Sequence, residues 1–106
     1  MSLRRAHSAE EYIEWVKQAV FEVNDLRACL EFDLEDIGQF PAFLEPLEEG
    51  VKGLYRAMCE GDYHFGREDL PFMDLVERYA DEIPFHTLLK QINETHRKGI
   101  DTDAAD

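Results

Sequence analysis

The sequence has few of the residues that mark disulfide-stabilised, secreted or membrane proteins. Its 106 residues include only two cysteines, Cys29 and Cys59, and these form neither a Cys-x-x-Cys pair nor a zinc-ligand spacing. We therefore expect both to be reduced residues that pack within helices. No apolar run approaches the ~20 residues that cross a bilayer. Nor does the stretch SAEEYIEW, which follows two early arginines, resemble a signal-peptide core. These absences predict a soluble cytoplasmic protein that does not enter membranes.

Positive charge is also scarce. The chain has 11 Lys and Arg residues against 24 Asp and Glu residues, which gives a formal net charge of −13. Such a field repels nucleic-acid phosphates and anionic membranes, so we expect neither as a partner. It favours a basic protein partner, or it serves solubility alone. The sequence leaves both interpretations open.

Motifs that carry known chemistry are missing as well. There is no phosphate-binding glycine loop, no Gly-x-Ser-x-Gly and no His-Glu-x-x-His. His96 lies one turn beyond Ile92 on an apolar stripe, but the Glu-x-x-His pairs of di-iron bundles do not occur. We therefore expect no cofactor, no metal site and no catalytic residue, and an enzyme is the minority interpretation.

What the sequence does have is strong helical periodicity. The clearest helix is 41–60, where apolar residues recur at steps of three and four and so share one face. Pro41 suits its first turn, and Gly61 suits a left-handed exit. Its core face comprises Leu44, Leu47, Val51, Leu54 and Met58.

Small residues line the flank of this helix. Gly50 and Gly53 each cost about 1 kcal/mol relative to alanine in a helix interior, so a compensating contact is expected. Together with Ala57 they would let a neighbouring backbone approach closely. This interpretation predicts that Gly53→Leu destabilises the protein by overpacking that contact.

Three further helices are expected, over 8–31, 70–81 and 84–98. Ser8 and Glu11 form a capping box at the start of the first. Asp69 precedes helix 70–81. Asp81 or Glu82 caps helix 84–98, and Gly99 ends it.

The expected fold class is therefore all-α, a single-domain antiparallel bundle of four main helices, with 1–7 and 100–106 frayed. A short helical turn near 33–38 joins the first two helices. The apolar residues of that connection are expected to cover the end of the core; they are Phe32, Leu34, Ile37 and Phe40.

The outer faces of two helices carry the candidate interaction residues. Phe21 falls opposite the apolar stripe of helix 8–31, among polar residues that include Glu14 and Asp25. It is either an ordinary exposed aromatic or an interface anchor, and a homodimer through Phe21 is one form of the second interpretation. Asp74 and Glu77 form a second acidic row on helix 70–81.

A loop rich in aromatic residues follows helix 41–60. Tyr63, His64 and Phe65 lie between two glycines, where they would form the lip of a ligand site. Alternatively, Tyr63 and Phe65 fold onto the core while His64 faces water.

Together these features predict a small acidic helical protein–protein interaction module, an adaptor or regulator that binds a basic protein surface. The alternative is a helical protein that binds a ligand or metal and acts as an enzyme. Its small aromatic pocket would be lined by Tyr55, Tyr63 and Tyr79.

Overall fold

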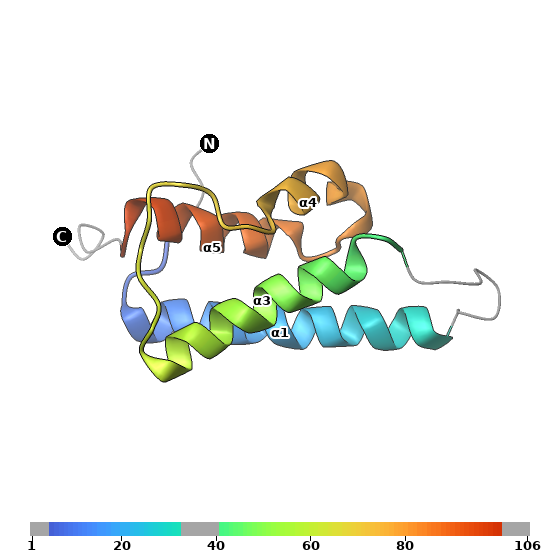
Figure 1. The fold of residues 1–106 in the computed structure, drawn as a ribbon, viewed down its shortest axis with the longest axis horizontal. Coiled ribbons are helices and arrows are strands. Elements are labelled where there is room, and N and C mark those ends of the chain that lie inside the picture. The colour runs from blue at the N-terminus through green and yellow to red at the C-terminus, as the bar shows by residue number, and fades with distance from the viewer. Residues whose placement is uncertain (1–4, 33–40, 101–106) are drawn as a thin grey trace.

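A computed structural model describes residues 5–32 and 41–100 of the chain, and it confirms the all-α helical bundle. The elements are α1 (Ala9–Phe32), α3 (Leu44–Glu60), α4 (Met73–Arg78), the 3-10 helix η1 (Ala80–Glu82) and α5 (His86–Lys98). Helix α1 runs antiparallel to both α3 and α5, and the loop after α3 crosses back along the bundle to reach α4 (Figure 1). Short α4 packs against α5. The turn expected near 33–38, with Leu34, Ile37 and Phe40, lies outside the described residues, whereas Phe32 is the last residue of α1.

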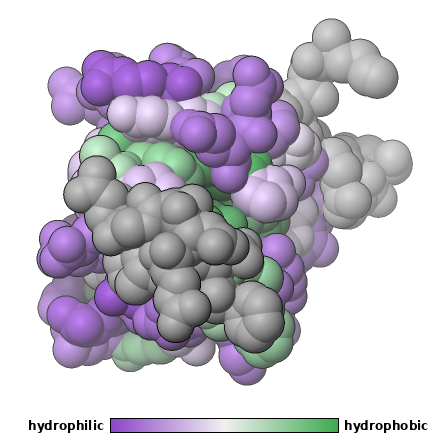
Figure 2. Space-filling model, turned by 90° about the vertical axis from the view of Figure 1, so that its right-hand side faces the viewer, coloured by the Kyte–Doolittle hydropathy of each residue, from purple (hydrophilic) through white to green (hydrophobic). Residues whose placement is uncertain are grey.

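The core forms where the periodic apolar faces of the helices meet. Helix α3 buries Leu44, Leu47, Val51 and Leu54, as its spacing predicts, whereas Met58 is only partly buried. Tyr12, Val16, Ala19 and Val23 of α1 are buried opposite them, and α5 contributes Leu89 and Ile92. At the end of the molecule where α1 finishes and α3 begins, hydrophobic surface gathers in a band framed by hydrophilic residues (Figure 2).

The start of α1 and the C-terminal ends of α3 and α5 are stabilised largely as expected. The Ser8 hydroxyl accepts a hydrogen bond from the Glu11 N–H at 3.1 Å. The Glu11 carboxylate accepts from the N–H of His7 at 3.2 Å, one residue earlier than in a standard capping box. Gly61 and Gly99 end α3 and α5 with φ of 77° and 86°, conformations that side chains disfavour.

The third and fourth helices are shorter than predicted. Instead of 70–81, the chain forms α4 over six residues and then η1, because Tyr79 leaves the helical region at φ −115° and ψ 27°. Instead of 84–98, α5 begins at His86, after a turn at Pro84. The expected caps were wrong: Asp81 and Glu82 lie within η1, and no side chain caps α5.

Of the two glycines predicted to make a close helix contact, only Gly50 makes one. A Cβ added at Gly50 would lie 2.9 Å from Cδ2 of Phe72, so a side chain, rather than a backbone, makes the close approach there. Nothing lies within 4 Å of the equivalent position at Gly53. The prediction that Gly53→Leu overpacks a close contact is therefore wrong.

Two further expectations need correction. Cys29 and Cys59 are both free but exposed, so they do not pack in the core. Residues 5–7 are held rather than frayed: Ala6 is fully buried, and its N–H donates to Oγ1 of Thr95 at 3.1 Å. The guanidinium of Arg5 donates to the carbonyl oxygens of Lys98 and Gly99 at the end of α5.

Candidate functional site

The outer face of α1 presents the first group of candidate residues as the sequence predicts. Glu14, Phe21 and Asp25 are all exposed, and Phe21 has 69% of its surface accessible. Phe21 also borders a shallow hollow with Asn24, Asp25 and Ala28. Neither Glu14 nor Asp25 forms an ion pair with any residue in the described parts of the chain.

The second acidic row does not join the first. Asp74 and Glu77 are exposed on α4, as expected. However, α4 packs on α5 and lies across the bundle from α1 (Figure 1). A single flat partner surface therefore cannot contact the acidic residues of α1 and those of α4 at the same time.

The aromatic loop folds onto the N-terminal half of α1. The ring of Phe65 stacks on that of Tyr12 with centroids 5.7 Å apart, and Tyr63 meets both rings edge-on. Tyr63 is partly buried, whereas Phe65, with 48% of its surface accessible, and His64 are exposed. Phe65 thus covers Tyr12 and still offers one face to the surroundings.

Tyr12, Tyr63 and His96 form a chain of hydrogen bonds beneath this loop. The Tyr12 hydroxyl donates to the Ile92 carbonyl at 3.2 Å and lies 2.8 Å from the Tyr63 hydroxyl. The Tyr63 hydroxyl in turn lies 2.6 Å from Nδ1 of His96. Each phenol has one proton to donate. All three bonds can therefore exist together only if Tyr63 donates to Tyr12 and Nδ1 of His96 carries a proton.

The surroundings of these three hydrogen-bonded side chains keep them neutral near pH 7. Burial raises the pKa of Tyr63 to about 12, and burial with the Tyr63 hydrogen bond raises the pKa of Tyr12 as well. Burial also lowers the pKa of His96 below 6.5. At neutral pH the two phenols are thus protonated and act as hydrogen-bonding groups that hold the loop.

The lowered pKa of His96 predicts a pH effect on stability. A base whose folded-state pKa is depressed stabilises the fold fully above its unfolded pKa of 6.5, and that contribution is lost as the pH falls through the folded value. We expect the free energy of unfolding to decrease as the pH falls below about 6.5, and His96→Gln to remove this component. Urea denaturation of both proteins on either side of that pH measures it. An identical pH profile for wild type and variant would contradict the assignment.

A small apolar pocket opens beside the hydrogen-bonded Tyr12 and Tyr63. Ala9, Tyr12 and Ile13 of α1 line it with Met58 of α3 and with Tyr63 and Phe65 of the loop. Its volume is about 150 Å³. We call it the α1–α3 pocket.

The aromatic pocket expected from Tyr55, Tyr63 and Tyr79 is not assembled as one site. Tyr79 stacks on Phe43 with centroids 5.0 Å apart, whereas Tyr63 contacts Tyr12. Tyr55 does not line the α1–α3 pocket, and a hydrogen bond with the Cys59 side chain raises its pKa. Sequence reasoning placed Tyr12 and His96 on apolar stripes, but it did not indicate that Tyr63 would join them.

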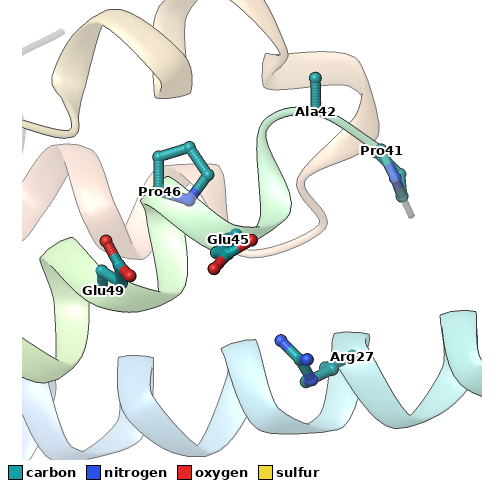
Figure 3. Close-up of a pocket in the computed structure, with 6 residues that line it drawn as sticks. All are labelled: Arg27, Pro41, Ala42, Glu45, Pro46 and Glu49. Carbon is teal, nitrogen blue, oxygen red and sulfur yellow. The ribbon is translucent and has the colours of Figure 1, made fainter. Parts of the chain in front are cut away.

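A further hollow is a groove where α1 ends and α3 begins. Arg27 reaches from α1 toward α3, where Glu45, Pro46 and Glu49 lie along the groove (Figure 3). The groove holds about 400 Å³. The Arg27 guanidinium already pairs with Glu48 at 3.1 Å and with Glu31 at 3.6 Å, so the groove carries no uncompensated positive charge for an anionic ligand.

Other kinds of site find no support in the described residues. No group of three or more His, Cys, Asp or Glu side chains is close enough there to hold a metal ion. Within the same residues, no helix has the length and apolar character needed to cross a membrane. Comparisons with protein-family models, with curated proteins and with solved structures gave no match for this chain.

Proposed function

We propose that this protein is an interaction module, an adaptor or regulator, that binds a basic surface of another protein through the outer face of α1. The observation that carries the proposal is the exposure of Phe21 in the middle of a long helix, with acidic residues on both sides of it. Phe21 is 69% accessible, and Glu14 and Asp25 share its face. An apolar anchor with a charged surround is a common arrangement at protein interfaces.

The charges and the aromatic ring contribute differently to this binding. Exposed ion pairs stabilise a complex by only ~0.2–1 kcal/mol each, but their summed field accelerates encounter with a basic partner. Burying the Phe21 side chain contributes about 1.5–3 kcal/mol, which is roughly a factor of ten or more in affinity. Lys17 lies on the same face, and Glu10, Glu14 and Asp25 outnumber it.

The acidic row on α4 supports the proposal in a different way. Asp74 and Glu77 are exposed on α4, which lies across the bundle from α1 (Figure 1), so they add to the long-range field and not to the same contact.

The test is capture of a partner at low salt, followed by affinity measurements with the purified partner. We expect a basic protein whose dissociation constant rises at least tenfold between about 0.05 and 0.5 M salt. Phe21→Ser should weaken binding about tenfold at either salt concentration. Ala28→Ser, on the same face, is the matched control and should change the affinity little.

Two outcomes would contradict this function. One is a partner that is held equally well at both salt concentrations, because the acidic surface would then serve solubility alone. The other is a wild-type protein that sediments as a dimer and a Phe21→Ser variant that sediments as a monomer, which would make Phe21 a self-association contact.

A further inference from the structure

We infer that the α1–α3 pocket binds a single apolar side chain that projects from a basic segment of the partner. This inference rests on the proposed function and identifies a second anchor point for the same partner. It follows from the size, the lining, the exposed apolar surface and the charged surroundings of the pocket.

The size of the pocket suits one side chain. A cavity of about 150 Å³ in a protein interior holds a benzene-sized molecule. The α1–α3 pocket has that volume and opens to the surface. A leucine, isoleucine, methionine or phenylalanine side chain is of comparable size, whereas a larger ligand would leave much of its surface in water.

The lining offers an apolar surface and no free hydroxyl donor. The hydroxyl protons of Tyr12 and Tyr63 are both used within the hydrogen-bond chain that ends at His96 and Ile92. A ligand therefore meets the aromatic rings of these residues, and a polar ligand would lose its hydrogen bonds to water without replacement.

The mouth of the pocket already exposes apolar surface that binding would bury. Among the described residues, the large hydrophobic side chains classed as exposed are Ile13, Phe21 and Phe65. Two of the three, Ile13 at 36% and Phe65 at 48%, line this one pocket. Such a concentration of exposed apolar side chains typically marks an interaction site.

The charges around the mouth select a basic segment. Glu10 and Glu14 are exposed neighbours of the lining residues Ala9 and Ile13, and Glu60 and Asp62 are exposed on either side of Gly61. Lys17, one turn beyond Ile13, is the nearest cation along α1. These four carboxylates are directly next to lining residues in the sequence, a position that no lysine or arginine shares, so they favour a partner that carries lysine or arginine beside its apolar residue.

The pocket also lies within reach of the α1 face that carries Phe21. Ile13 and Phe21 are eight residues apart on one helix, which corresponds to about 12 Å along the axis. About four extended residues, or two helical turns, span that distance. One basic segment can therefore occupy the pocket and cover Phe21 at once.

Matched peptides test this inference by NMR titration of the whole protein. The probe is a short peptide with one central leucine flanked on each side by three lysine or arginine residues, and in its control serine replaces leucine. At low salt we expect the leucine peptide to bind about tenfold more tightly and to shift the amide signals of Ile13, Met58 and Gly61. Ile13→Ser should abolish the difference between the peptides, while Phe21→Ser should preserve it.

The outcomes separate this inference from the function on which it rests. If both basic peptides bind equally well, the acidic surface binds by charge and the pocket is not an anchor. If the leucine peptide shifts signals around Phe21 and not around Ile13, the apolar side chain binds elsewhere. If a glutamine-flanked leucine peptide binds as tightly as the basic one, the pocket takes apolar ligands without regard to charge. If no basic peptide binds, the proposed function fails together with the inference.

Discussion

Asn93→Leu is expected to lower the free energy of unfolding by about 2 kcal/mol, because Asn93 holds a buried backbone group that has no other partner. Its Oδ1 accepts from the N–H of Leu70 at 2.8 Å, and its Nδ2 donates to Asp69 at 3.0 Å. Only 7% of Asn93 and 6% of Leu70 is accessible, so water does not replace the lost bond. Leaving a buried donor unpaired costs ~1–3 kcal/mol, which corresponds to a decrease in Tm of about 10 °C in a chain of this size.

Two variants and one local measurement isolate the role of Asn93. Asp69→Ala removes the exposed partner together with its ion pair to Arg97 at 3.6 Å, and it should cost under 1 kcal/mol. Gln91→Leu makes a comparable amide-to-leucine change on the same helix, and the Gln91 side chain forms no hydrogen bond within the described residues. In Asn93→Leu, amide hydrogen exchange at Leu70 should become faster. An Asn93→Leu protein as stable as the wild type would show that this bond contributes nothing to the fold.

The second large effect concerns two glycines of α3 that are alike in sequence and opposite in environment. Gly50→Ala should destabilise the protein by about 1 kcal/mol or more, because the new methyl group would meet the buried Phe72 ring at 2.9 Å. Gly53→Ala should stabilise it by about 0.5–1 kcal/mol, because Gly53 is exposed and alanine favours the helix. Thermal melts followed by circular dichroism give both values.

A second substitution tests the cause of the Gly50 effect. If the Phe72 ring is responsible, Gly50→Ala in a Phe72→Ala background should lose most of its cost, because alanine removes the Cδ2 atom at 2.9 Å. An increase in Tm for Gly50→Ala as large as that for Gly53→Ala would contradict the close contact.

The pattern of apolar residues was enough to predict the helices and their buried faces. Spacing placed Leu47 and Val51 in the core and Phe21 on the surface, and the structure agrees. The glycine exits at Gly61 and Gly99 also follow from local chemistry. These features depend on residues within one or two turns of each other, so the sequence contains the needed information.

Features that depend on distant parts of the chain were not predictable in this way. Helix 70–81 is shorter than predicted because Tyr79 leaves the helical region, and the N–H of Leu70 is held by Asn93 of α5, 23 residues further along the chain. Gly50 and Gly53 look equivalent until Phe72 is placed against one of them. The candidate site shows the same limit: individual residues were recognised, but the pocket depends on a loop that packs back on α1.

The position of α5 has a consequence for synthesis on the ribosome. Helices α1 and α3 leave the ribosome first and pack extensively with each other. Ala6, Tyr12 and Leu70 each form a hydrogen bond with a residue of α5, the last of the described helices in chain order. Until it emerges, those groups lack their hydrogen bonds, and the apolar faces that α5 later covers stay open to water or to other chains. The interval before α5 is complete is therefore when the nascent protein is most prone to aggregate or to bind a chaperone.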